Sequence, residues 1–344
     1  MATALVPLAD RAIHPAALKL VGIARMAAES PKARERASIE YFAFDSRTAL
    51  NRESSGRMPF DWTLNPYRGC EFGCKYCYAR YTHEFMELRD GLDFERKIFA
   101  KVNAPDLLRG ELVRARDRGQ SIALGTATDP YQPAEKQFEI TRRILEVFAN
   151  FEGLDFSITT KSVLILRDLD LLKQITARHR FSVHLTVTTT DERLARLLEP
   201  RAPTPAKRLE AVARLAEAGI DVCVNAMPIL PGITDELQAL DDLARQAAKA
   251  GAKSIYGNVL FLMPSAMSFF MPFLEAEFPQ LSARYHRLYA RSAYLNGDYK
   301  DRMMKLMADL RAKSGLNQRG EGPASPKGRL QLSLPWGDDG SLHN

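Results

Sequence analysis

Three cysteines lie within eight residues of one another, at Cys70, Cys74 and Cys77, in the spacing C-x3-C-x2-C. Thiolates are soft ligands that suit iron–sulfur clusters and zinc. A closed zinc site or a fully ligated [4Fe–4S] cluster needs four protein ligands. Because no fourth cysteine lies nearby, the spacing favours a [4Fe–4S] cluster in which one iron lacks a protein ligand and is open to chemistry.

Two other metal sites stay open for these cysteines. His83, six residues after Cys77, would complete a zinc site, although a C-x2-C half-site normally meets a second half-site and none is present in the sequence. Cys223 would complete an electron-transfer cluster, but its apolar run Asp-Val-Cys-Val-Asn indicates a buried small side chain. Disulfides are not expected, because the first 28 residues lack a secretory pattern and three clustered cysteines cannot all pair.

The chain that surrounds the cysteines alternates between strand and helix patterns. Helical patterns carry apolar residues at three- and four-residue spacing, as in Leu164, Leu169 and Leu172. We expect strands at 62–67, 121–125, 155–159, 181–188, 221–227 and 253–260, and helices at 138–151, 163–179, 207–218 and 236–250. Six such βα units predict a parallel sheet with right-handed crossovers, open or curved into a full or partial barrel. In barrel enzymes the active site lies at the carboxyl ends of the strands, where the cysteine loop is expected.

The composition is that of an ordinary globular protein, with 344 residues, 46% hydrophobic and 26% charged. Apolar runs such as 254–263 are too short to span a bilayer, so we expect no membrane segment and a cytoplasmic location. The net charge is +6, and the segment 284–329 holds eleven Lys and Arg against four Asp and Glu. That excess has two interpretations, a face for nucleic-acid phosphates or ordinary solvated helices.

Four segments are expected from these patterns. Residues 1–57 are polar and predicted to be an irregular N-terminal extension with one amphipathic stretch near 15–28. Residues 58–270 form the predicted barrel core, and 271–318 a helical C-terminal region. Residues 319–344 are rich in Gly, Pro and Ser and predicted to be a flexible tail, in which the apolar patch 330–336 is a candidate for docking on the body.

The segment Asn-Pro-Tyr-Arg-Gly-Cys at 65–70, continued by Cys-Tyr-Ala-Arg at 77–80 and Thr-His-Glu at 82–84, resembles radical S-adenosylmethionine (SAM) proteins. The resemblance is to their spore photoproduct lyase-like branch, often labelled DNA repair photolyase-like. It extends over about residues 50–270 through the segments 128–135, 159–162, 199–201 and 227–232. It implies a partial (β/α)6 barrel of the TIM type with a [4Fe–4S] cluster and SAM as cofactors. It further implies an enzyme in which SAM chelates the open iron and is cleaved reductively to methionine and a 5′-deoxyadenosyl radical.

The same resemblance implies roles for individual residues. Tyr76 resembles the aromatic that packs near the adenine, and Lys161 resembles the lysine that meets the SAM carboxylate. The remaining candidates for SAM contacts are hydroxyls at strand ends and a Glu-x-Arg motif, namely Thr126, Thr128, Thr186, Thr188, Glu199 and Arg201. Each residue also has a purely structural interpretation. Tyr76 would be a core aromatic, Lys161 a solvated lysine and the threonines strand-packing residues, and Glu199 and Arg201 would form an ion pair.

Four further residues belong to the same loops. Gly69 and Gly73 flank the first two cysteines and have two interpretations: glycines at positive φ that let the backbone approach closely, or ordinary loop glycines. Asp129 and Glu135 stand on a loop at the rim of the barrel, and we expect one of them to contact substrate without a role in proton transfer.

Two departures from the family limit the prediction. Phe72 stands where many relatives carry His, which alters the surroundings of the cluster but not its ligands. The segment 125–129 has no thiol, whereas true spore photoproduct lyase has a hydrogen-donating cysteine at the end of the second strand. Direct reversal of spore photoproduct is therefore not expected.

We expect a radical SAM enzyme whose substrate is unassigned, with a nucleic-acid base as the candidate. The alternative is a non-catalytic, metal-containing nucleic-acid-binding protein. The expected partners are a low-potential electron donor such as flavodoxin or ferredoxin, with nucleic acid as a further candidate.

Overall fold

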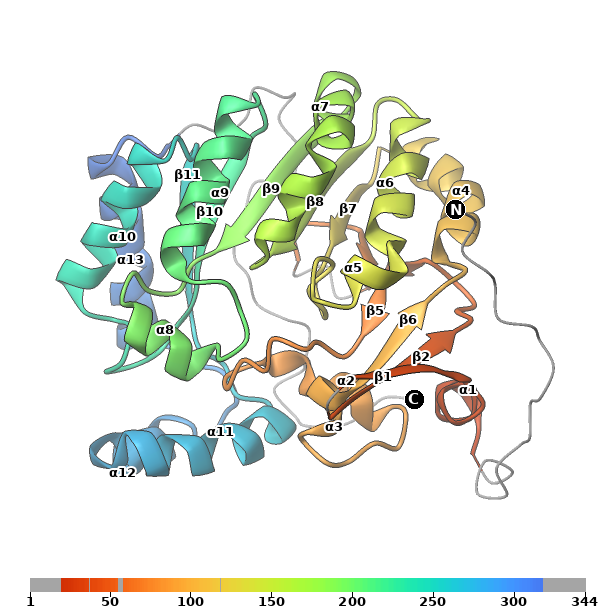
Figure 1. Ribbon diagram of the computed structural model, residues 1–344. Helices are drawn as coiled ribbons and strands as arrows, with labels where there is room; N and C mark the ends of the chain where they lie inside the picture. Colours follow the sequence, from red (N-terminus) through yellow and green to blue (C-terminus); the bar gives the residue numbers. More distant parts are fainter. Residues whose placement is uncertain (1–19, 37, 55–57, 118, 318–344) are drawn as a thin grey trace.

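A computed structural model describes residues 20–317 apart from 37, 55–57 and 118 (Figure 1). Its main sheet has the strand order β11-β10-β9-β8-β7-β4-β3, in which β4 and β7 to β11 are parallel and β3 is an antiparallel edge. The strands are β3 (Leu50–Arg52), β4 (Trp62–Leu64), β7 (Ser121–Leu124), β8 (Asp155–Thr160), β9 (Arg180–Thr186), β10 (Val222–Ile229) and β11 (Ser254–Val259). Six parallel strands that do not close on themselves within the described residues confirm the predicted α/β fold.

Helices cover the outer face of this sheet (Figure 1). They are α4 (Ala104–Asp117), α5 (Glu135–Phe138), α6 (Ile140–Ala149), α7 (Leu169–Arg178), α8 (Glu192–Leu198), α9 (Pro205–Glu217) and α10 (Leu237–Lys249), with a 3-10 turn, η3 (Val163–Asp168), before α7. Local sequence sets their starts: the Thr204 hydroxyl accepts a hydrogen bond from the Lys207 N–H, and Pro205 occupies the first turn. Each predicted helix is present within two or three residues, except that the first six residues of 163–179 form the 3-10 turn.

Alternation along the strands decides which side chains face the helices. In β8, Phe156, Ile158 and Thr160 are buried, whereas Ser157 and Thr159 are partly exposed and line the barrel interior. Successive strand residues point to opposite faces, so the apolar set builds the core and the polar set lines a cavity. This lining differs from that of a typical TIM barrel, whose interior is packed with branched apolar side chains.

A second sheet lies beside the barrel, with the order β1-β2-β6-β5 (Figure 1). Its strands are β1 (Lys32–Arg36), β2 (Ile39–Phe44), β5 (Tyr67–Arg68) and β6 (Lys97–Lys101), and α1 (Gly22–Ala28) packs beside it through Ala27. The prediction of an irregular extension over 1–57 is therefore wrong for much of its described part. The predicted strand 62–67 is also divided, because Pro66 has no N–H for a ladder and the chain passes from β4 to β5 there.

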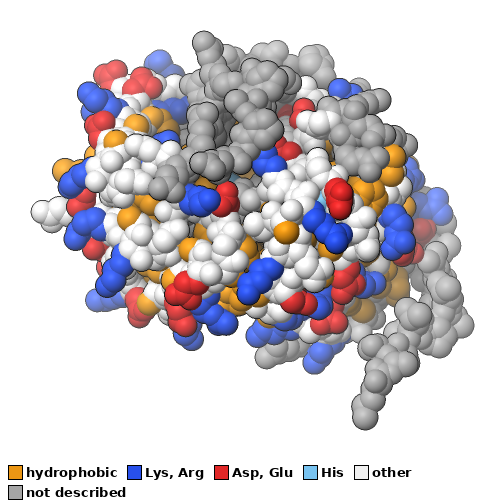
Figure 2. Space-filling model, turned by 90° about the horizontal axis from the view of Figure 1, so that it is seen from above, with side chains coloured by type: hydrophobic (Ala, Val, Ile, Leu, Met, Phe, Trp, Pro, Cys, Tyr) orange, Lys and Arg blue, Asp and Glu red, His pale blue; other side chains and the backbone are white. Residues whose placement is uncertain are grey.

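The C-terminal region is helical, as predicted, with α11 (Pro264–Glu277), α12 (Pro279–Leu288) and α13 (Asp298–Lys313). Two of its basic residues have partners within the chain: Lys313 pairs with Asp241 at 2.8 Å, and the Arg311 guanidinium lies 5.2 Å from the Tyr256 ring centroid. Positive and negative side chains are interspersed over the face in Figure 2. No helix among the described residues has the length and apolar character to cross a membrane.

Some predictions fall outside the described residues, among them the tail 319–344, the apolar patch 330–336 and the first part of the stretch 15–28. The proposed segment boundaries stay predictions.

Candidate functional site

The cysteine loop begins directly after β5 and ends at the 3-10 turn η2 (Tyr78–Arg80), which is followed by α2 (Tyr81–Glu84) and α3 (Asp93–Arg96). Cys70, Cys74 and Cys77 are free thiols, and all three line one cavity of about 2070 Å³ that extends through the barrel interior. Pockets for a single small ligand measure about 300–1,000 Å³, so this cavity has room for a cofactor and a substrate together.

Glycines give the loop its turns. Gly69 and Gly73 adopt φ of +83° and +64°, which confirms their interpretation as glycines at positive φ. A Cβ on Gly69 would lie 2.8 Å from the carbonyl oxygens of Phe94 and Lys97, so any larger residue collides with backbone there. The Phe94 carbonyl also accepts a hydrogen bond from the Cys70 N–H at 2.9 Å.

Gln132 and Thr128 hold the loop from the side of β7. The Gln132 side-chain amide and the Thr128 hydroxyl donate to the Gly69 carbonyl at 3.0 and 2.6 Å. The Glu71 N–H donates to the Gln132 side-chain oxygen at 3.0 Å. The Thr128 hydroxyl is thus committed to positioning the loop, and it accepts from Gln132 as well.

A buried ion cluster holds the second half of the loop. Arg80 donates to the Cys74 carbonyl at 3.1 Å and pairs with Glu95 at 3.3 Å, and Arg201 pairs with the same carboxylate. The Arg80 guanidinium also lies 3.4 Å from the centroid of the Phe269 ring on α11. Arg201 thus fixes the loop from outside the cavity, with Glu95 instead of Glu199 as its ion-pair partner.

Burial raises the pKa of all three thiols, to about 12 for Cys74. Charge on Cys74 and Cys77 adds to the rise at Cys70. A metal would hold them as thiolates, because a cation reverses the cost of burying their charge. No group of three His, Cys, Asp or Glu side chains in the described part of the chain is already arranged around a metal position.

The other two candidate ligands, His83 and Cys223, are not on the cysteine loop, and His83 is not among the residues that line the cavity. The His83 ring packs against Phe94 and Phe99, and its Nε2 bonds the Lys97 carbonyl at 3.0 Å. Burial lowers the pKa of His83 to about 4, so the ring is neutral at pH 7. Cys223 is partly exposed in β10 and lines the barrel cavity, so the expected position in a packed core is wrong. Because side chains alternate along a strand, Val222 and Val224 face the core and Cys223 faces the cavity.

A buried network fixes Tyr76 at the end of the loop. The Tyr76 hydroxyl donates to Glu199, which also accepts from the Thr188 hydroxyl at 3.2 Å and pairs with buried Arg208. Burial alone would raise the pKa of Glu199, but the charges of Arg208 and Lys161 hold it below the ordinary value. Glu199 is therefore an anion below the cavity floor, and neither it nor Thr188 lines the cavity.

Lys161 follows β8 and lines the cavity beside the cysteines. Its ammonium lies 5.7 Å from the Tyr76 ring centroid, and its backbone N–H donates to Asp129 at 2.7 Å. Burial alone would lower the pKa of Lys161, but the Glu199 carboxylate and Cys74 in its thiolate form raise it above the ordinary value. Lys161 is therefore a fixed cation at the rim.

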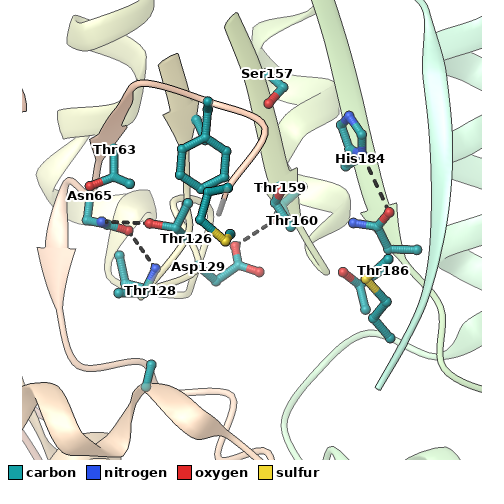
Figure 3. A pocket seen from close by; sticks show the side chains of 18 of the residues that line it. Thr63, Asn65, Thr126, Thr128, Asp129, Ser157, Thr159, Thr160, His184 and Thr186 are labelled. Atoms are coloured by element: carbon teal, nitrogen blue, oxygen red, sulfur yellow. Dashed lines mark hydrogen bonds between the residues drawn. The ribbon is translucent and has the colours of Figure 1, made fainter. Parts of the chain in front are cut away.

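The hydroxyls after β7 and β9 point into the same space (Figure 3). Thr126 accepts from the Asn65 side-chain amide at 3.1 Å, and the Asn65 oxygen accepts from the Ala127 N–H at 2.8 Å. Thr186 lines the cavity at the end of β9, opposite Asn225 of β10.

The two carboxylates on the rim loop are positioning groups. Asp129 accepts from the Thr160 hydroxyl at 2.6 Å as well as from the Lys161 N–H, and it lines the cavity. Glu135 is fully buried, where it accepts from Tyr67 and pairs with Arg167 at 2.8 Å. Glu135 is thus away from the cavity.

The structure therefore brings eight of the eleven predicted residues to one cavity. These are Cys70, Cys74, Cys77, Tyr76, Thr126, Thr128, Lys161 and Thr186. Thr188, Glu199 and Arg201 lie behind it. Three positioning residues were not predicted, because their partners are distant in sequence. Asn65 positions the rim loop at Thr126, and Gln132 and Glu95 position the cysteine loop.

Comparison with known proteins agrees with this geometry. Residues 64–244 match the model of the radical SAM superfamily. Uncharacterized proteins of Mycobacterium tuberculosis and Mycobacterium bovis are each 36% identical over 297 residues, 86% of this chain and 86% of theirs. An uncharacterized protein of Methanocaldococcus jannaschii is 33% identical over 174 residues, 51% of this chain and 62% of its own length.

Among solved structures, spore photoproduct lyase complexed with dinucleoside spore photoproduct has a similar fold. The TM-score is 0.59 at 15% identity, and the match covers 80% of each chain. A mutant of that lyase with bound AdoMet and dinucleoside spore photoproduct matches with a TM-score of 0.55 at 16% identity over 79% of each chain. With its matched domain, its parallel barrel and its three-cysteine loop at the carboxyl ends of the strands, the chain belongs to the radical SAM superfamily.

Proposed function

We propose that this protein is a radical SAM enzyme that binds a [4Fe–4S] cluster through Cys70, Cys74 and Cys77 and reductively cleaves SAM. The observation that carries the proposal is the arrangement of the loop: three free thiols from eight consecutive residues line one cavity, beside a fixed cation and a polar rim. Family membership supports the cofactor, since a cluster and SAM are what the superfamily implies.

The residues present fit the cofactor by their chemistry. Cys70, Cys74 and Cys77 would hold the cluster as soft thiolate ligands, one fewer than its irons, and the glycines at positive φ let the loop backbone approach closely. When bound and reduced, the cluster would supply the electron for reductive cleavage of SAM.

The protein's own groups orient SAM. Lys161 offers a buried point charge for the SAM carboxylate, and Tyr76 presents a ring held by Glu199. Asn65 fixes the Thr126 hydroxyl by hydrogen bonding, so this group is preorganised at the rim. The charges of Glu199 and Arg208 remain behind this surface and hold it rigid.

The barrel interior beyond the rim is a candidate substrate site. Its middle part is lined by neutral hydrogen-bonding groups, including Ser157, Thr159, His184, Asn225 and Tyr256, whereas charged residues line it only toward the amino ends of the strands, namely Asp155, Arg180, Asp221 and Lys253. His184, labelled in Figure 3, faces Asn225 with Nδ1 3.4 Å from the amide oxygen. Its ring also stacks near Tyr256. Burial lowers the pKa of His184, which favours the neutral ring. Such a lining suits a flat, polar, uncharged group, and a nucleic-acid base is our candidate; the fold likeness to a lyase complexed with a dinucleoside supports the class.

We further propose a low-potential donor such as flavodoxin or ferredoxin as the electron source.

Anaerobic reconstitution tests the proposal. The reduced protein should contain four irons and four sulfides per chain, as a [4Fe–4S] cluster requires, and should convert SAM to 5′-deoxyadenosine. Cys70→Ala, Cys74→Ala and Cys77→Ala should each abolish cluster assembly, whereas Cys223→Ala, the matched control, should assemble it. One zinc per chain without acid-labile sulfide, or loss of the cluster in Cys223→Ala, would contradict the proposal and favour a structural metal.

A further inference from the structure

Two cations stand together in the cavity without an acidic partner among the described residues. Lys101 ends β6 and is 3% exposed, yet its ammonium forms no ion pair or hydrogen bond with any residue that the structure describes. Arg68 ends β5, and its Nε is buried without a hydrogen-bond partner. Both side chains line the cavity that holds the cysteine loop.

Strand pairing places the two side chains on one face. Arg68 lies opposite Phe99 in the antiparallel pair of β5 and β6, and Lys101 follows two residues later on the same face. Such diagonal neighbours are about 7–8 Å apart, within reach of one ligand held by two long side chains. The Arg68 charge acts on Lys101 and adds to the effect of burial, which lowers the pKa of Lys101 to about 7.

The surroundings do not neutralise this pair. Phe44 lies beneath the guanidinium, with its ring centroid 5.7 Å from Arg68 Cζ, and Tyr81 is the nearby polar group that acts on Arg68. Glu53 lines the same cavity and acts electrostatically on Tyr81. An isolated buried charge is unfavourable, and a second like charge beside it makes burial more unfavourable, so an anion is the ligand that this arrangement fits.

We propose that Arg68 and Lys101 bind a phosphate group of the substrate beside the cysteine loop. A phosphate accepts from a guanidinium and an ammonium at once and offsets both charges. Arg68 is separated from Cys70 only by Gly69, so a ligand held there extends along the cavity toward the cysteine loop. The substrate class is then a phosphate-containing nucleotide or nucleic-acid strand. That this ligand is the substrate of the enzyme rests on the proposed function. That the two cations bind a phosphate group does not.

Thermal unfolding of the reconstituted protein tests the binding. Phosphate stabilises many proteins by exclusion, so the comparison is phosphate against chloride at equal ionic strength, in wild type, Lys101→Met and Lys249→Met. Lys249 is exposed on α10, away from the cavity, and supplies the matched loss of charge. Wild type and Lys249→Met should gain stability specifically from phosphate, and Lys101→Met should lose that specific gain. In chloride at pH 6, below the Lys101 pKa of about 7, Lys101→Met should melt above wild type, because it removes an uncompensated buried charge.

Direct binding distinguishes the sources of the phosphate. Inorganic phosphate, thymidine 5′-monophosphate and single-stranded oligothymidylate are titrated into each protein. The tightest of the three identifies the source, and Lys101→Met should weaken it roughly tenfold to a hundredfold. Equal affinity of Lys101→Met and wild type for all three probes would overturn the proposal, as would a lower melting temperature of Lys101→Met in chloride, which would indicate a partner within the chain. SAM cleavage by wild type is measured in a separate assay. Loss of SAM cleavage with phosphate binding intact would contradict the proposed function and leave the phosphate site standing.

Discussion

Replacement of Gly69 by Ala tests whether the turn before Cys70 positions the cluster ligands. An Ala at φ +83° pays about 1–2 kcal/mol for the left-handed backbone. Its Cβ would also lie 2.8 Å from the Phe94 carbonyl oxygen, the acceptor of the Cys70 N–H. Displacement of that carbonyl loses a hydrogen bond worth about 1 kcal/mol, so we expect a total loss of about 2–3 kcal/mol in the free energy of unfolding.

Gly153→Ala is the matched control. Gly153 adopts a similar φ of +72°, but a Cβ there meets nothing within 4 Å, so only the backbone cost of about 1–2 kcal/mol applies. Urea denaturation gives both free energies, and iron per chain after reconstitution reports the loop. Gly69→Ala should lose iron, and Gly153→Ala should retain it. If the two variants matched in both measurements, the steric argument for the loop would be wrong.

Three further predictions concern the site and its surroundings. Lys161→Met should weaken SAM binding by about one to two decades at full iron content, because it removes a charge-assisted contact; unchanged affinity, with Lys249→Met as control, would place Lys161 outside the SAM site. His83 has a folded pKa of about 4, below the unfolded value, so its contribution is present above about pH 6.5 and is lost as the pH falls toward 4. Between pH 7 and 5 the wild type should therefore lose about 2 kcal/mol more than His83→Leu in urea denaturation, and equal losses would show that the ring protonates freely. Finally, spore photoproduct should not be repaired efficiently, because the segment 121–135 has no thiol; clean formation of two thymines at the rate of SAM cleavage would refute this.

The barrel was predictable because its strands and helices differ in period. Helix-facing residues of β8 such as Phe156 and Ile158 are apolar, and parallel strands bring their carboxyl ends to one edge, so the place of Lys161 followed from its position after a strand. The three cysteines were predictable because eight residues contain them all.

The second sheet and the supporting ion pairs were not predictable from local pattern. The sequence of β6 is Lys-Ile-Phe-Ala-Lys, in which a lysine at each end leaves only three apolar residues, too few for a clear strand pattern. The strand with which it pairs in parallel, β2, is far away in sequence. Glu95 meets Arg201 across a separation of 106 residues, a contact that only tertiary packing creates. Cys223 is different: the alternation of Asp221, Cys223 and Asn225 with valines was a signal for the cavity face.

The polar lining of the barrel separates stability from specificity. Val183 and Leu185 of β9 are fully buried toward the helices and contribute most of the burial free energy of that strand, whereas Ser182 and His184 face the cavity and contribute little. Substitutions among the lining residues therefore cost the fold little, while each one changes the hydrogen bonds offered to a ligand. A barrel built in this way can acquire a new substrate through a few point mutations without first being stabilised elsewhere.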